Sequence, residues 1–166
     1  EMSSKNHPQL VYMKSENCRQ LKTLLNIRRR MVGTRARIIL QAKSTLRGLG
    51  VKESQRDLKS KNGFARAIYH LGDDPFYEAM IGKMSLESSE ETAKIAATEK
   101  QIMDLIEQFF SQEYAWLISI PGISFVTAAT ILSVVDDIDR FQRAGQFSSY
   151  CGLVPSEHSS GDKVVH

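Results

Sequence analysis

Two stripes of apolar residues that repeat every seven positions constrain the fold of this chain more than any other feature. In the first stripe the repeat is Leu25, Val32, Ile39 and Leu46, and the face is widened by Leu21, Leu24, Met31, Ile38, Ala42 and Leu49. In the second the repeat is Ile95, Ile102, Phe109 and Trp116, and the face is widened by Thr98, Met103, Leu105 and Ile106. Heptad spacing lays an apolar seam along one face of a helix, and such a seam needs a partner helix. The stripes predict an all-α fold, with residues 16–48 packed antiparallel on residues 87–111 in a long, coiled-coil-like helical hairpin.

Local signals predict where these helices begin and end. Ser15 or Asn17 is a suitable N-cap for the first long helix, and Gly48 and Gly50 are expected to end it. Asn62-Gly63 predicts a turn before a short helix over residues 64–71.

A second short helix is expected over residues 76–84, after the cap and first-turn proline that Asp74 and Pro75 supply. The second long helix is then expected to begin near residues 85–89. The C-terminal part predicts helices over residues 114–119 and 126–135, joined at Pro121-Gly122 as a helix-hairpin-helix. A helix over residues 144–150 and an exposed terminal loop complete the prediction.

We therefore expect three parts. Residues 1–14 form a leading segment, residues 15–111 a helical linker with small capping helices, and residues 112–166 a C-terminal helical domain.

Composition excludes several classes of protein. Cys18 and Cys151 form no CxxC pair, which predicts a reduced, intracellular chain without a zinc site. No apolar run approaches the length of a membrane span, so we expect no contact with a membrane. The aspartates at 136, 137 and 139 are interpreted as a solvated helix end, and we predict no metal site. The glycine-rich motifs of nucleotide-binding proteins are absent from the sequence.

Charge is distributed unevenly along the sequence. Residues 1–52 carry twelve Lys or Arg against two acidic residues, and residues 53–166 carry ten against seventeen. Residues 17–52 hold ten cations and no acid, so this segment lacks the ion pairs that an ordinary solvated helix forms between its own side chains. Such a pattern favours contact with nucleic-acid phosphates. The candidate contacts are Arg28, Arg29, Arg30, Arg35, Arg37, Lys43 and Arg47. The alternative is a helix face that is merely solvated.

Two further segments are candidates for function. A tight turn at Gly122 and Ser124 can present backbone amides to a phosphate, although the same sequence suits an ordinary turn between packed helices. The terminal loop holds His158, Ser159 and Ser160, but neighbouring side chains in a loop usually diverge, so adjacency is poor evidence for a catalytic pair. A polar surface loop is the alternative.

The segment from Ile120 to Lys163 contains a set of short motifs, namely Ile120-Pro121-Gly122-Ile123, Thr127-Ala128, Asp139-Arg140-Phe141, Gln146-Phe147, Tyr150, Gly152-Leu153, Pro155 and Ser160-Gly161. With these motifs the segment resembles the C-terminal transposase domain of the insertion-sequence recombinases that also carry an N-terminal RuvC-like DEDD domain, the bridge-RNA-guided recombinases. The upstream helices look like that family's helical linker.

The resemblance implies a DNA recombinase in which Ser160 attacks a DNA phosphate, with Ser159 as the second candidate. Gly122, Ser124 and Lys163 would then join the linker arginines as nucleic-acid contacts. DNA, a structured guide RNA and further copies of the chain are the implied partners, and the bacterial or archaeal cytoplasm, near the nucleoid, is the implied location. The family's Mg²⁺ site belongs to the RuvC-like domain, so no cofactor is expected here.

No DEDD set is recognisable among the 166 residues, and we expect a fragment, truncated at its C-terminus, that does not recombine DNA alone. Two alternatives remain open. One is a non-catalytic helix-hairpin-helix module that binds nucleic acid, and the other is a helical oligomerisation scaffold.

Overall fold

The computed structural model describes residues 13–72, 74–150, 158–160 and 163–165. In these residues the fold is all-helical apart from one short β-hairpin, which confirms the predicted fold class. The chain divides into two compact units, residues 1–134 and 135–166. No helix in the described residues is long and apolar enough to cross a membrane.

Helix α1, Glu16–Gly48, has the predicted bounds. The Ser15 side chain accepts a hydrogen bond from the Cys18 amide, which satisfies one free donor of the first turn. Gly50 ends the helical path with a φ of 82°, a conformation that favours glycine because it has no Cβ.

Helix α3, Pro75–Phe109, is one continuous helix, so the prediction of two helices over this range was wrong. Asp74 and Pro75 supply the predicted start, since the Asp74 carboxylate accepts from the amides of Phe76 and Tyr77. The second long helix was expected to begin near residues 85–89, but Ser88 is a buried residue in the interior of α3. Packing on both sides of this point holds the segment helical and outweighs the weak local preference of serine.

The prediction of a turn at Asn62-Gly63 was also wrong. These residues lie in the first turn of α2, Lys61–His70, which follows a 3-10 turn η1, Asp57–Lys59. Gly63 allows the close approach between them, because a Cβ there would lie 1.9 Å from the Asp57 carbonyl oxygen. Ser60 caps α2 by accepting from the Gly63 amide.

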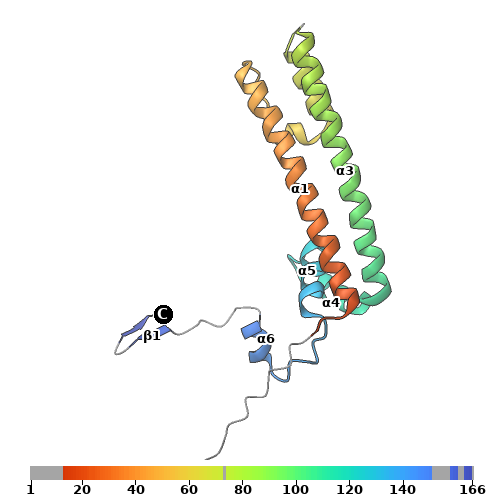
Figure 1. Cartoon of the computed structure of the whole chain (residues 1–166), viewed down its shortest axis with the longest axis vertical. Helices are drawn as coiled ribbons and strands as arrows, with labels where there is room; N and C mark the ends of the chain where they lie inside the picture. The colour runs from red at the N-terminus through yellow and green to blue at the C-terminus, as the bar shows by residue number, and fades with distance from the viewer. Residues whose placement is uncertain (1–12, 73, 151–157, 161–162, 166) are drawn as a thin grey trace, which may run out of the picture. The chain divides into compact units, whose positions relative to one another are not determined.

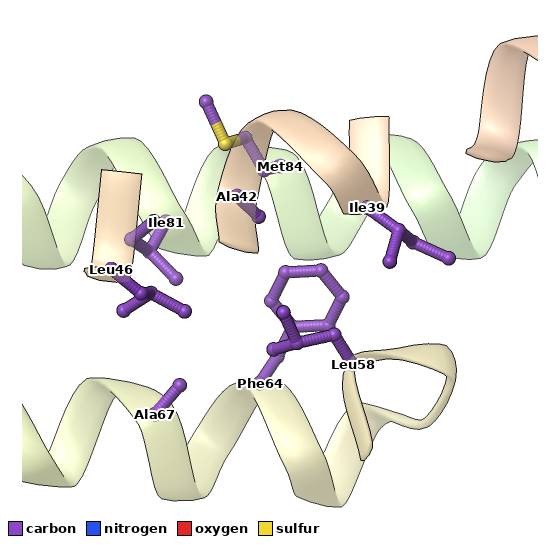
Figure 2. Close-up of a cluster of buried hydrophobic side chains, with 8 residues drawn as sticks. All are labelled: Ile39, Ala42, Leu46, Leu58, Phe64, Ala67, Ile81 and Met84. Carbon is purple, nitrogen blue, oxygen red and sulfur yellow. The ribbon is translucent and has the colours of Figure 1, made fainter. Parts of the chain in front are cut away.

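Helices α1 and α3 pack antiparallel, as predicted (Figure 1). A hydrophobic core lies toward each end of the pair. Figure 2 shows the first core, where α1 and α3 meet η1 and α2. Its buried members are Ile39, Ala42, Leu46, Leu58, Phe64, Ala67, Ile81 and Met84.

The second core joins the first turns of α1 to the end of α3 and to α5. Its buried members are Cys18, Leu21, Ile102, Ile106, Phe110, Ala129 and Leu132. The Cys18 thiol is fully buried in this core and donates to the Leu132 carbonyl at 3.2 Å.

The heptad stripes overstate the buried seam. Val32, Leu49 and Phe109 are exposed, because a seven-residue repeat drifts around an α-helix of 3.6 residues per turn. Trp116 was predicted on the second stripe but lies beyond the helix break at Phe110, on α4, with 62% of its surface exposed.

Helices α4, Ser111–Ser119, and α5, Phe125–Val135, flank the turn at Pro121-Gly122. The second unit contains α6, Ala144–Tyr150, and a two-stranded antiparallel sheet of β1, His158–Ser160, and β2, Lys163–Val165. The prediction of a terminal loop was therefore wrong for the described residues 158–160 and 163–165. Their backbone pairs in a hairpin, which we call the serine hairpin.

Candidate nucleic-acid interface and serine hairpin

The predicted nucleic-acid residues of α1 fall on two sides of the helix. Arg28 is on the side that faces α3, where its Nε donates to the Glu99 carboxylate at 2.7 Å. The two side chains are 22% and 36% exposed. Arg28 is therefore already engaged in an ion pair that links the two long helices.

Arg35 follows Arg28 by seven residues and so lies on nearly the same face. Its Nη2 donates to the Lys59 carbonyl at 2.8 Å, which ties α1 to η1. Sequence reasoning grouped Arg28 and Arg35 with the exposed arginines, whereas the structure uses both to hold other elements in place.

The other side of α1 presents cations to solvent. Lys22, Arg29, Arg30 and Arg37 are exposed, and we call them the exposed cationic face. Lys22 and Arg29 are seven residues apart, as are Arg30 and Arg37, so each pair lies along the helix axis. None of the four makes an ion pair within the described residues. Unopposed cations in a row attract a polyanion.

Lys43 and Arg47 lie near the end of α1 and line a groove of about 500 Å³ with Lys52 and Glu53. Sequence reasoning included Lys52 in the acid-free window but did not single it out as a contact. The signal available was its place at the end of that window, just after the helix-ending Gly50.

The turn between α4 and α5 has the tight geometry that the sequence indicated. Gly122 has a φ of 90°, and the Ile123 amide donates to the Ile120 carbonyl at 3.1 Å. The Ser124 hydroxyl accepts from the Thr127 amide at 3.3 Å, so it satisfies a donor at the start of α5.

The surroundings of this turn contain no cation from the same stretch of sequence. Residues 101–139 include six acidic residues and no Lys or Arg. A phosphate at Gly122 would therefore meet backbone amides without support from a neighbouring positive side chain of this segment.

The serine hairpin brings two predicted site residues into register. Ser160 pairs with Lys163, and Ser159 pairs with Val164. Sequence reasoning placed Ser160 and Lys163 in one loop without predicting that they face each other across strands. Residues 161 and 162 between them lie outside the described residues.

The acidic residues after α5 form a local turn. The Asp139 amide donates to Asp137 Oδ1 at 2.8 Å. The described residues contain no group of three His, Cys, Asp or Glu that could hold a metal ion. The second unit also holds a contact that sequence reasoning missed, since the Arg140 guanidinium lies 4.3 Å and 4.4 Å from the ring centres of Phe141 and Tyr150.

Comparison with known proteins finds a family match in the C-terminal stretch. Residues 114–166 match the family model described as Transposase IS116/IS110/IS902 family. This stretch is similar to an insertion-sequence transposase domain. The match covers the α4–α5 turn, α6 and the serine hairpin, and confirms the predicted resemblance at the level of an insertion-sequence transposase.

Two curated relatives extend the similarity over nearly the whole chain. A transposase for insertion sequence element IS1111A from Coxiella burnetii is 26% identical over 167 residues, which cover 99% of this chain. A probable family 20 transposase from Pseudomonas aeruginosa is 23% identical over 165 residues, or 97% of this chain. The chain spans about half of these relatives, 45% and 48% of their lengths. No solved structure matches.

Proposed function

We propose that this chain is part of an insertion-sequence DNA transposase, in which α1 contacts nucleic acid and Ser160 is the nucleophile. The family match over residues 114–166 includes Ser160, and both curated relatives are named as transposases. The observation that carries the nucleic-acid part is the exposed cationic face, because its four cations have no acidic partner in the described residues.

Contact with the sugar-phosphate backbone is the binding mode that this face supports. Arginine places two parallel donors on phosphate oxygens, and a row of such groups follows a strand without reading its bases. α1 carries no aromatic residue on which bases could stack. The proposed contact is therefore independent of sequence, and target choice would come from elsewhere, including a structured guide RNA.

The proposed chemistry is transesterification at a DNA phosphate. The Ser160 oxygen forms a bond to phosphorus, the bond from phosphorus to the departing DNA oxygen breaks, and the serine proton is transferred to a base while the leaving oxygen gains a proton. A serine hydroxyl is a weak nucleophile, so this step needs activation and neutralisation of charge at the phosphate. The described residues contain no group of three His, Cys, Asp or Glu that could hold a metal ion, and we assign no step of this reaction to a metal.

A covalent adduct tests the assignment of the nucleophile. The full-length enzyme that contains this chain is incubated with end-labelled DNA, and the protein-DNA linkage is mapped by mass spectrometry. We expect Ser160→Ala to abolish the adduct and the neighbouring Ser159→Ala to retain it. An adduct that survives Ser160→Ala would refute the assignment.

The isolated chain is expected to bind nucleic acid without recombining it. Purified chain is mixed with donor and target DNA, and products are amplified across the new junction. The absence of junction product alongside measurable DNA binding supports the proposal. Junction product formed by this chain alone would contradict it.

A non-catalytic nucleic-acid-binding module is the second candidate, because the exposed cationic face does not depend on the serine hairpin. In that case DNA binding persists, but no adduct forms in the full-length enzyme.

A helical oligomerisation scaffold is the third candidate, since Leu40 on α1 and Trp116 on α4 are large apolar residues left exposed. A mass that stays monomeric at all concentrations would exclude it, and with it the homo-oligomer expected through the helical linker.

A further inference from the structure

Helix α1 stops at the upper end of the helical pair in Figure 1. A cation-rich groove lies at this helix end. Its walls are Lys43, Arg47, Gly50, Val51, Lys52 and Glu53. An adjoining cavity of about 360 Å³ shares the last four of these residues and adds His70. We call the two cavities together the tip groove.

The cations of the tip groove are not neutralised by its one carboxylate. Nε and Nη2 of Arg66 donate to the two carboxylate oxygens of Glu53, at 3.1 Å and 2.9 Å. The Glu53 side chain is only 6% exposed, and the hydrogen bonds from Arg66 lower its pKa below the ordinary value. Glu53 therefore stays ionised and satisfied by Arg66. Lys43, Arg47 and Lys52 make no ion pair within the described residues.

The carbonyl groups at this end of α1 are capped by hydrogen bonds, so they repel an anion less than uncapped carbonyls would. The last carbonyls of a helix carry partial negative charge. Here the amides of Leu49, Gly50 and Val51 donate to the carbonyls of Thr45, Arg47 and Leu46, respectively, at 3.2, 3.1 and 2.9 Å. The positive φ of Gly50 makes this capping possible.

The tip groove also continues the exposed cationic face. Arg47 follows Arg29 by eighteen residues, which is about five turns of an α-helix, so the two arginines lie on one side of α1 about 27 Å apart. A nucleic-acid strand that runs along α1 from Arg29 would reach Arg47 at the groove. Lys52 then adds a cation from the loop after the helix.

We propose that the tip groove binds a phosphate group through Lys43, Arg47 and Lys52, and that this phosphate belongs to the nucleic acid that follows the exposed cationic face. Three cations from a helix and a loop suit a phosphate, whose several oxygens accept from donors in different directions. The assignment of this phosphate to a nucleic acid rests on the proposed function. The inference that the groove binds a phosphate group does not.

The test separates the two possible sources of phosphate. The whole ¹⁵N-labelled chain is titrated with sodium tripolyphosphate and, in a second series, with a short DNA duplex. The tip variant is Lys43→Gln/Lys52→Gln. The control variant is Lys83→Gln/Lys100→Gln, which removes the same charge from exposed positions of α3. Circular dichroism establishes that both variants keep the helical content of the parent chain.

We expect tripolyphosphate to shift the amide resonances of Gly50 and Lys52 in the parent chain. The tip variant should lose about tenfold in affinity for both ligands, the factor that corresponds to 1.4 kcal/mol at 25 °C, and the control less than about twofold. If the tip variant loses affinity for tripolyphosphate but not for DNA, the tip groove is a phosphate site for a free anion, and its assignment to nucleic acid is wrong. Equal losses in the two variants, or no shift at Gly50 and Lys52, would overturn the proposal even if DNA binds elsewhere on α1.

Discussion

Helix α1 and the segment from residue 101 to 139 share one hydrophobic core but have opposite surfaces. Leu21 of α1 and Ile106 of α3 are buried together in the second core with Leu132 of α5. Outside this core, residues 17–52 carry ten cations and no acid, while residues 101–139 carry six acids and no cation. Burial therefore does not explain the difference in charge.

This difference shows that the two sequence signals for nucleic-acid binding, the cationic segment and the tight turn at Gly122, lie in separate regions of the molecule. The charge lies on the long helix, and the tight turn at Gly122 lies in a segment without cations. Because long-range attraction to nucleic acid is dominated by charge, α1 is expected to supply most of the salt-dependent affinity. The turn at Gly122 can add at most a local contact.

The largest expected effect comes from the core that both regions share. Ile106→Ala removes a fully buried side chain, and we expect the free energy of unfolding to fall by about 2–5 kcal/mol. Ile120→Ala, at a position that is 49% exposed, is the control and should change it by less than about 0.5 kcal/mol. Chemical denaturation measures both. Similar losses in the two variants would mean that the second core is not packed as described.

Glycine-to-alanine changes compare the two regions directly. Gly122→Ala adds a Cβ at a φ of 90°, and we expect a loss of about 1–2 kcal/mol in unfolding free energy. Gly33→Ala, inside α1, is expected to gain about 0.5–1 kcal/mol, because alanine is the better helix former. An added Cβ has open space at both positions. Thermal unfolding with the same sign for both variants would contradict the backbone argument.

The smallest expected effect separates the two sides of α1. Arg28→Gln breaks the ion pair with Glu99 and should lower the unfolding free energy by up to about 1 kcal/mol, because the pair is partly exposed. Arg29→Gln, the neighbouring exposed residue, should leave stability nearly unchanged. Denaturation of the Glu99→Gln variant and of the double variant completes a cycle. A coupling of zero would show that Arg28 and Glu99 do not stabilise the helix pair.

The sequence predicted those parts of the fold that depend on strong local signals. The bounds of α1 follow from the Ser15 cap and the glycines after Arg47, and the start of α3 follows from Asp74 and Pro75. The continuity of α3 through Ser88 could not be predicted, because it depends on packing against α1 and α2 that local preference does not record.

The candidate site could be predicted by region but not by residue. An acid-free window identifies a cationic helix, yet only the register between α1 and α3 shows that Arg28 meets Glu99 while Arg29 faces solvent. The tip groove depends on the pairing of Glu53 with Arg66, thirteen residues along the chain, which the charge pattern does not reveal. The register that pairs Ser160 with Lys163 likewise depends on strand pairing that the local sequence signals do not reveal.

The most direct test of the central claim is the salt dependence of DNA binding by the whole chain and two triple variants. Arg29→Gln/Arg30→Gln/Arg37→Gln alters the exposed cationic face, and Lys59→Gln/Lys83→Gln/Lys100→Gln removes the same charge from other exposed positions. If α1 holds the phosphates, the slope of log K against log salt flattens by about three units in the first variant and by less than about one in the second. Equal flattening in both, or none in the first, would contradict the account.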